Sequence, residues 1–239
     1  LKDLSDVRDL EIKVQRKERL AAVGTLAAGI AHEVRNPLSS IRGYATFFET
    51  LFDDGSENKK AASIMAEEVD RVNRVISELL EFARPVNLKL EKTDIAVFVN
   101  NSLRLIKYEA ETANVNILKK IDSSLPNVEI DHDRFSQVLL NLYINAIQAM
   151  ENGGDLTIRV GAQKEDLVFE ISDTGEGISS EDQANIFNPY FTTKKKGTGL
   201  GLPIVNKIIE SHYGSINIIS SKTKGTTFVV SIPINRRRI

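Results

Sequence analysis

A single histidine, His32, stands inside a regular helical pattern near the start of the chain. Apolar residues recur there at every third or fourth position, which predicts one apolar stripe of a long helix. They are Leu20, Val23, Ala27, Ile30, Val34, Leu38, Ile41, Ala45 and Phe48. At about 100° per residue, His32 lies roughly 200° from Ile30 and points away from the stripe. An imidazole on that face could act as a nucleophile or exchange a proton near neutral pH.

Two polar neighbours favour a chemical role for His32. Glu33 follows directly and could accept a ring proton, and Asn36, one turn later, could hold a water or an oxyanion. Pro37 lies in this helix and has no backbone N–H to donate to the helical hydrogen bonds. We therefore expect the helix to bend or loosen just past the histidine. The alternative is that His32 is an ordinary surface or core residue, as a lone helical histidine usually is.

A second group of residues is suited to a polyphosphate. Asn141 and Asn145 are one turn apart, so both amides project from the same face of an otherwise apolar helix. Amide oxygens suit a hard cation such as Mg²⁺, which usually keeps waters and phosphate oxygens as its other ligands. Two buried structural asparagines remain the alternative.

The first of two glycine stretches is Asp173-Thr-Gly175-Glu-Gly177, which follows a predicted strand. The glycines allow a backbone to approach a flat ligand closely, and a buried Asp173 could accept a hydrogen bond from an exocyclic amine such as that of adenine. By itself this pattern is often only a turn.

The second stretch is Gly197-Thr198-Gly199-Leu200-Gly201, which opens a helix. Free N–H groups and the positive helix end can face phosphate there. The residues between the two stretches, 189–196, are typical of a mobile flap that carries three lysines. We select Lys194 as a phosphate contact; the alternative is a solvated loop.

Composition limits the class of protein. The chain has 239 residues, 41% hydrophobic and 27% charged, which is typical of one large or two ordinary folded domains. Its net charge of −2 argues against general nucleic-acid binding, and the absence of cysteine removes disulfides and thiolate metal sites. The sequence contains no apolar run long enough to span a membrane. We expect it to be a fragment of something longer.

The first part of the chain predicts helices only. Residues 4–17 have the spacing of a helix that runs into a coiled coil. We expect the long helix to end near Phe52 and a second helix to cover 57–83, with Pro85 as its stop. The apolar face of such a hairpin is too large to cover with itself, so we predict a homodimer with a four-helix bundle. The alternative is that the hairpin packs on the rest of this chain.

Beyond a boundary near residues 84–92, helices alternate with short strands. The expected helices cover 95–113, 133–150, about 180–187 and 200–213, and the expected strands cover 115–121, 128–131, 156–162, 167–172, 215–221 and 226–232. Together they predict an α+β sandwich, a mixed sheet with helices on one face. His132 and His212 carry no comparable neighbours, and we interpret both as ordinary surface residues.

These residues together resemble the sensor histidine kinases of two-component systems. The dimerisation and phosphotransfer hairpin of that family carries a His-Glu-x-x-Asn-Pro-Leu box, which residues 32–38 match. Its ATP-binding domain, shared with the gyrase, Hsp90 and MutL group, carries an asparagine box and two glycine boxes. Residues 141–146, 173–177 and 197–201 match them in the same order. The resemblance covers about residues 20–233.

The resemblance implies a protein-histidine kinase of two domains. Residues 1–19 would be a coiled-coil entry helix, 20–88 the dimerisation and phosphotransfer domain, and 89–239 a catalytic ATP-binding domain of the Bergerat type. His32 would receive phosphate from ATP, with Glu33 as general base, and pass it to an aspartate of a response regulator receiver domain. Asn36 would orient water for the reverse, phosphatase reaction.

The resemblance also implies ligands in the ATP site. Asn145 would hold Mg²⁺ with help from Asn141, and Asp173 would read adenine. The second glycine box and the flap would enclose the phosphates, with Phe187 as the aromatic residue that leads into the flap. The flap departs from many relatives because it is short and lacks their arginines, which leaves Lys194 as its candidate phosphate contact.

The sequences of the flap and of residues 35–41 are similar to those of the nitrogen-regulation and zinc-response branches of the family, whose partners often activate σ54 promoters. We therefore expect the cytoplasmic portion of a protein that upstream segments anchor in the bacterial inner membrane. Whether a protomer phosphorylates its own or its partner's histidine stays open.

Two other functions remain as alternatives. One is a nucleotide-gated clamp, which would have no use for an outward His32-Glu33 pair. The other is a dimerising scaffold with a degenerate ATP site, against which the three intact ATP motifs argue.

Overall fold

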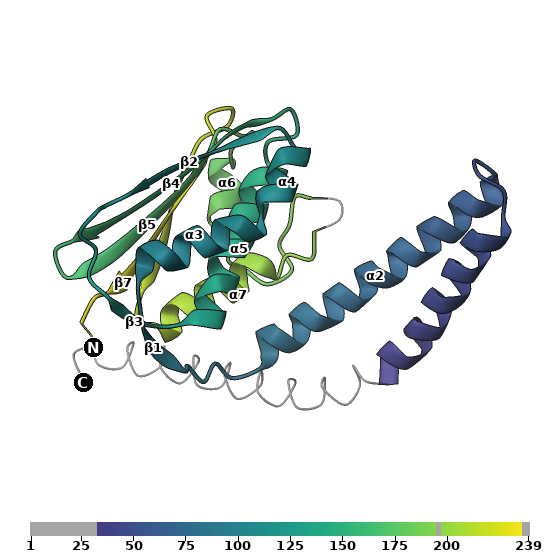
Figure 1. Cartoon of the computed structure of the whole chain (residues 1–239), viewed down its shortest axis with the longest axis horizontal. Helices are drawn as coiled ribbons and strands as arrows, with labels where there is room; N and C mark the ends of the chain where they lie inside the picture. Colours follow the sequence, from purple (N-terminus) through teal and green to yellow (C-terminus); the bar gives the residue numbers. More distant parts are fainter. Residues whose placement is uncertain (1–32, 195–196, 236–239) are drawn as a thin grey trace. The chain divides into compact units, whose positions relative to one another are not determined.

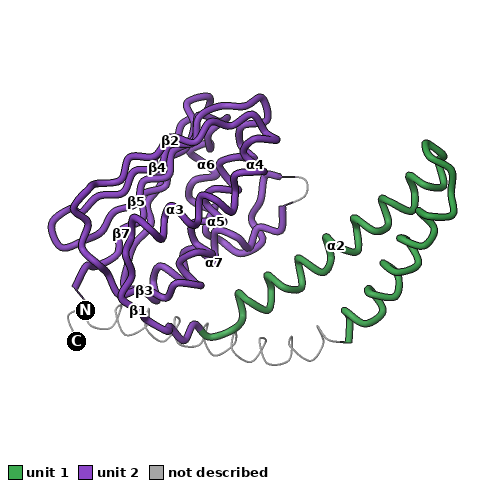
Figure 2. Tube along the Cα trace, viewed as in Figure 1, with its two compact units in different colours: residues 1–85 green, residues 86–239 purple. Residues whose placement is uncertain are grey.

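The computed structural model describes residues 33–194 and 197–235. The chain divides into two compact units, Leu1–Pro85 and Val86–Ile239 (Figure 2). In the part of the chain that the structure describes, no helix combines the length and the apolar character needed to cross a membrane.

The first unit is a helical hairpin. Residues 33–51 are helical, and α2 (Glu57–Ala83) returns alongside them (Figure 1). The predicted turn starts α2 as expected, because the Ser56 side chain accepts a hydrogen bond from the backbone N–H of Lys59. An ion pair between Arg42 and Asp70 (Nε to Oδ1, 2.7 Å) joins the two helices. His32 lies outside the described residues.

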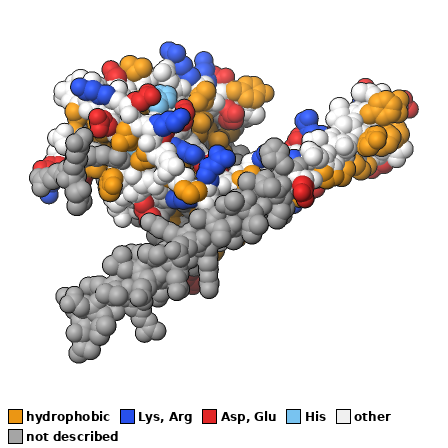
Figure 3. Space-filling view, turned by 90° about the horizontal axis from the view of Figure 1, so that it is seen from below, with side chains coloured by type: hydrophobic (Ala, Val, Ile, Leu, Met, Phe, Trp, Pro, Cys, Tyr) orange, Lys and Arg blue, Asp and Glu red, His pale blue; other side chains and the backbone are white. Residues whose placement is uncertain are grey.

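The hairpin leaves large apolar side chains exposed towards its tip. The exposed fractions are 66% for Tyr44, 60% for Leu51 and 66% for Ile64. Phe47 and Phe48 are also exposed, and their ring centroids are 6.2 Å apart. Orange side chains gather at this end of the hairpin in Figure 3. This much exposed apolar surface is typical of a face that another molecule covers.

The second unit is built on a five-stranded sheet of order β2-β4-β5-β7-β6. Its strands are β2 (Val115–Ile121), β4 (Gly154–Gln163), β5 (Asp166–Asp173), β6 (Ser215–Ser220) and β7 (Thr226–Pro233). Only β2 and β4 pair in parallel, so the sheet is mixed. The helices lie on one of its faces (Figure 1). The predicted α+β architecture is confirmed.

A helix that runs along the middle of this face forms the core. It is α5 (His132–Gln148), capped by Asp131, whose side chain accepts from the backbone N–H of Arg134. Its Phe135, Leu139, Leu142 and Tyr143 are fully buried. α7 (Gly201–Ser211) packs beside it. The two helices that carry the asparagine and second glycine motifs are therefore direct neighbours.

Three elements differ from the sequence-based expectation. The expected strand β3 (Val128–Asp131) pairs with β1 (Leu90–Thr93) in a small second sheet, whereas the sequence suggested no strand at β1, next to the expected boundary near residues 84–92. The helix expected over 95–113 is broken into α3 (Ile95–Leu105) and α4 (Lys107–Thr112), because the chain bends at the buried Ile106. α6 (Ser180–Gln183) is shorter than expected, since tight turns follow it.

The interpretation of His212 as a surface residue was wrong. Its side chain is only 2% exposed, and its Nε2 accepts the backbone N–H of Asp131 at 3.0 Å. The other ring nitrogen, Nδ1, then carries the proton and donates to the carbonyl of Ile208 at 2.8 Å. His212 thus joins the end of α7 to the start of α5. His132 is exposed, as predicted, and its ring packs edge-on against Phe98.

A further contact ties the start of this unit to α5. The backbone N–H of Lys89 donates to Asp131 Oδ2 at 2.7 Å, while Asp131 Oδ1 caps the helix. The buried carboxylate of Asp131 therefore caps the start of α5 and also holds the segment that leads into this unit.

Candidate functional site

The two asparagines of α5 are presented towards other predicted motifs. Asn141 Nδ2 donates to the carbonyl of Gln137 at 3.0 Å, which leaves its Oδ1 directed at the start of α7. A Cβ added at Gly201 would lie 3.2 Å from this Oδ1. The asparagine box and the second glycine box therefore meet at this point. Neither asparagine is the fully buried structural residue of the alternative interpretation.

Asn145 meets the flap instead. The ammonium of Lys194 donates to Asn145 Oδ1 at 3.1 Å and to Gln148 Oε1 at 2.9 Å. Burial lowers the pKa of Lys194, whereas the nearby carboxylates of Glu176 and Asp173 act to raise it. The sequence interpretation missed Gln148. Its spacing was the available signal, because Gln148 lies three residues after Asn145 on the same helix face.

Asp173 ends β5 in a buried position, with 7% of its surface exposed. Its Oδ1 accepts backbone N–H groups from Gly175 at 2.9 Å and from Thr226 at 3.1 Å. Among the described residues, none donates to the other oxygen, Oδ2. Burial raises the pKa of Asp173, while the two N–H groups and the charge of Lys194 oppose this rise.

The glycines around Asp173 allow close contact within the protein. A Cβ at Gly175 would collide with the carbonyl oxygen of Ala149, just after α5, and the N–H of Glu176 donates to that same oxygen at 3.2 Å. Gly177 has a φ of +72°, and a Cβ there would collide with the carbonyl of Ser221. We expected these glycines to approach a ligand; their described contacts are with protein backbone. They bring Asp173 to the end of α5.

The second glycine stretch starts α7 without a side-chain cap. Leu200, at the cap position, is fully buried, and its N–H donates to Thr198 Oγ1 at 3.3 Å. Gly199 has a φ of +70°, and its carbonyl accepts the N–H of Tyr190 from the flap at 3.0 Å. An uncapped helix start of this kind leaves N–H groups that can bind an anion. Gly197 and the half-buried Phe187 lie in the segment leading up to it.

The residues predicted to act on the phosphoryl group lie in the other unit. Glu33 and Asn36 are both exposed, and the helix continues without interruption through Pro37.

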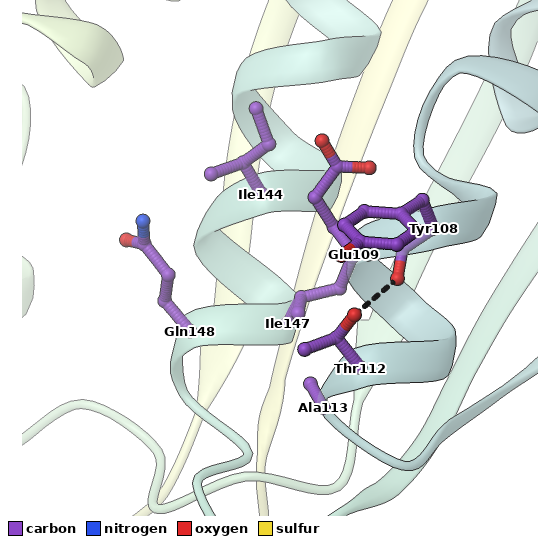
Figure 4. Close-up of a pocket in the computed structure, with 7 residues that line it drawn as sticks. All are labelled: Tyr108, Glu109, Thr112, Ala113, Ile144, Ile147 and Gln148. Atoms are coloured by element: carbon purple, nitrogen blue, oxygen red, sulfur yellow. Dashed lines mark hydrogen bonds between the residues drawn. The ribbon is translucent and has the colours of Figure 1, made fainter.

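A hollow between α4 and α5 is separate from these motifs (Figure 4). It has a volume of about 290 Å³ and is lined by Tyr108, Glu109, Thr112, Ala113, Ile144, Ile147 and Gln148. Asp173 and the glycine boxes do not line it. Gln148 lines this hollow and also contacts Lys194 of the flap.

The site's residues fit a divalent cation in one respect. The Asn145 oxygen already accepts a hydrogen bond from a cation, the ammonium of Lys194. In the described part of the chain, no three histidine or acidic side chains gather as a metal site. A Mg²⁺ ion here would therefore take its remaining ligands from phosphate and water, as this ion commonly does.

Comparison with known proteins agrees with this arrangement. Residues 22–87 match the "His Kinase A (phospho-acceptor) domain", and residues 130–236 match the "Histidine kinase-, DNA gyrase B-, and HSP90-like ATPase". The sensor histidine kinase ZraS of Escherichia coli K12 is 43% identical over 229 residues, covering 96% of this chain and 49% of ZraS. The chain thus spans about half the length of this curated relative.

Solved structures give the same result. ShkA in complex with AMPPNP matches with a TM-score of 0.75 and 25% identity, covering 89% of this chain and 46% of ShkA. Histidine kinase ThkA in complex with response regulator protein TrrA matches with a TM-score of 0.70 and 29% identity, covering 96% of this chain and 67% of ThkA. The catalytic domain of ThkA alone matches with a TM-score of 0.57 and 32% identity, covering 62% of this chain and 97% of that domain.

The hairpin and the mixed-sheet ATPase unit define the class of protein: a two-component protein-histidine kinase. The chain belongs to the sensor histidine kinase family, and its similarity to ZraS is consistent with the zinc-response branch.

Proposed function

We propose that this chain is the catalytic core that moves the γ-phosphoryl group of ATP to His32 and then to an aspartate of a response regulator. One observation carries the proposal. Three motifs far apart in the sequence converge on α5: Asn141 faces Gly201, Asn145 contacts Lys194, and Gly175 lies against Ala149. The similarity to ThkA, which has been solved in complex with response regulator protein TrrA, supports a response regulator as partner.

In this proposal the domains are those expected from the sequence. Residues 20–88 form the dimerisation and phosphotransfer domain, residues 89–239 form the ATP-binding domain, and 1–19 lead in from upstream. The exposed aromatic and aliphatic side chains of the hairpin support a homodimer, because a second copy would cover them. We also propose anchoring through upstream segments and a partner of the σ54-activator type, on the basis of the branch similarity.

The nucleotide would be held by groups with complementary chemistry. Asp173 Oδ2 can accept from the adenine amine, and the uncapped start of α7 can donate to phosphate oxygens. Phe187, Gly197 and Lys194 would complete the phosphate side. Asn145 and Asn141 would hold Mg²⁺. When bound, this ion would neutralise charge on the phosphates.

The chemical step requires little covalent work from the protein. A neutral ring nitrogen of His32 attacks the γ-phosphorus in line, and the bond from phosphorus to the departing ADP oxygen breaks. Glu33 accepts the proton from the other ring nitrogen, so the phosphorylated ring does not carry an additional positive charge. General-base assistance of this kind contributes roughly 10²- to 10⁴-fold. The donors at the start of α7 stabilise the negative charge on the leaving group.

Asn36 would serve the reverse reaction. It is exposed one turn after the phosphoryl acceptor, where its amide can orient a water towards the aspartyl phosphate of the partner.

The test uses the chain as it is, incubated with γ-labelled ATP. The unaltered chain should incorporate acid-labile, alkali-stable label, which is typical of phosphohistidine. His32→Ala should incorporate none while it binds ATP with unchanged affinity. Equal labelling of the two chains would contradict the assignment of His32.

A further inference from the structure

The ammonium of Lys194 lies between two neutral amide oxygens of α5. Its distances are 3.1 Å to Asn145 Oδ1 and 2.9 Å to Gln148 Oε1. The carboxylates of Glu176 and Asp173 act on it only through their longer-range charge. The flap lysine is therefore held by two amides that α5 presents one turn apart.

One of these amides has a second proposed task. Asn145 is the residue whose amide oxygen would ligate Mg²⁺. An ammonium in hydrogen-bond contact with the same oxygen would then lie within a few ångströms of the ion. Two cations at that separation repel each other strongly in a partly buried site. Lys194 and Mg²⁺ therefore cannot share the Asn145 oxygen.

Gln148 decides how firmly the lysine is held. It belongs to none of the sequence motifs, and it offers Lys194 an acceptor oxygen at the shorter of the two distances. A neutral amide holds an ammonium less strongly than a carboxylate would, because the amide oxygen carries only a partial charge and lacks the full Coulomb attraction. The lysine is thus held but can be released.

We propose that Gln148 is a positioning residue that keeps Lys194 on the Asn145 oxygen while the site is empty, and that Lys194 leaves this oxygen for the phosphates when a Mg²⁺–nucleotide binds. This inference rests on the proposed function. Its consequence is that Mg²⁺–nucleotide binding includes the cost of freeing Lys194, whereas binding of nucleotide without Mg²⁺ leaves the contact with Asn145 available.

The experiment measures ADP affinity by calorimetry, with Mg²⁺ or with EDTA, in the His32→Ala chain so that no phosphate is transferred. Gln148→Leu removes one acceptor and should tighten Mg²⁺–ADP binding by about 3- to 10-fold. Gln148→Glu should weaken it by a similar factor. Neither change should alter ADP affinity in EDTA by more than about twofold. Gln148 is exposed, so both variants should fold, and circular dichroism checks this.

The decisive control repeats both substitutions in a Lys194→Met background. If Gln148 acts through Lys194, its effects vanish there. The exposed Lys222→Met serves as the matched lysine control and should leave them intact. Effects of Gln148 that persist without Lys194, or that are equal with and without Mg²⁺, overturn this inference alone. Failure of the parent His32→Ala chain to bind any nucleotide overturns the proposed function as well.

Discussion

Asp173 Oδ1 accepts the backbone N–H of Thr226 at 3.1 Å, so the last residue of β5 is fastened to the first residue of β7. The same oxygen accepts the N–H of Gly175. These two bonds aim the carboxyl group while its second oxygen stays available to a ligand. The residue predicted to recognise adenine is therefore positioned by two backbone donors, one at the start of β7 and one just after the end of β5.

We expect Asp173→Asn to separate binding from stability. The asparagine oxygen can keep both backbone donors, but the amide cannot accept from an adenine amine with its nitrogen. ADP affinity should fall by more than about tenfold. The fold should persist, which circular dichroism will show alongside the calorimetric titration. Unchanged ADP affinity in a folded variant would contradict the adenine role.

The same substitution gives a pH prediction. Burial raises the pKa of folded Asp173 above its ordinary value of 3.8, so the folded state binds more protons than the unfolded state between the two values. The contribution of Asp173 to the free energy of unfolding is thus fully present below pH 3.8 and is lost as pH rises through the folded pKa. Urea unfolding from about pH 4 to 8 should show this decline, and Asp173→Asn should remove it. At pH values above the folded pKa, where the buried carboxylate of the unaltered chain is charged, the variant should be the more stable of the two chains.

Two glycine substitutions should have opposite signs. Gly175→Ala places a Cβ against the carbonyl of Ala149, and we expect a destabilisation of about 1–3 kcal/mol in the unfolding of the ATPase unit. Gly43→Ala lies in the helix over 33–51 with nothing within 4 Å of its new Cβ. It should stabilise the hairpin by about 0.5–1 kcal/mol, since alanine favours a helix. Denaturation followed by circular dichroism measures both, and stabilisation by Gly175→Ala would show that the loop does not pack as described.

His212 should matter for stability although it takes no part in the proposed chemistry. His212→Phe keeps an aromatic ring beside Phe135 but removes the acceptor for the buried N–H of Asp131. We expect a loss of about 1–3 kcal/mol in the free energy of unfolding. The matched control is His132→Ala, whose exposed ring makes only an edge contact with Phe98, and it should cost less than about 1 kcal/mol. Thermal unfolding of both variants compares them directly.

Asn36→Ala should separate the proposed autophosphorylation of His32 from the proposed phosphatase reaction. Autophosphorylation from γ-labelled ATP should stay within about twofold of the unaltered chain, because Asn36 takes no part in the attack. Dephosphorylation of the phosphorylated response regulator should fall by at least about tenfold, since the water loses its orienting amide. The measurement is the decay of labelled regulator in the presence of the chain and ADP. An unaltered decay rate would refute the role of Asn36.

Most strands and helices could be predicted because their periodicity and capping residues act locally. Ser56, Asp94 and Ser179 each cap the helix that follows them, and β2, β3 and α2 have the bounds expected. Elements that depend on distant partners were missed. β1 has four residues and forms only because β3 pairs with it. The bend at Ile106 follows from burial of its side chain, which no local signal encodes.

The candidate site divides in the same way. Motif spacing selected Asn141, Asn145 and Asp173 as candidates, because the chemistry considered needs a specific residue type at a fixed position. The contact of Gln148 was not predicted because its partner, Lys194, is 46 residues away. His212 was misinterpreted because its acceptor role depends on Asp131, 81 residues away. Contacts of this kind follow from the folded arrangement of the chain.

The bond from the Lys89 N–H to Asp131 fixes the point at which the chain enters the second unit. Between the end of α2 at Ala83 and this anchor, only residues 84–88 are available as a tether. Fully extended, that segment reaches roughly 20 Å. In the proposed phosphotransfer, the length of this connecting segment would therefore set the greatest distance over which the ATP-binding unit can reach a histidine.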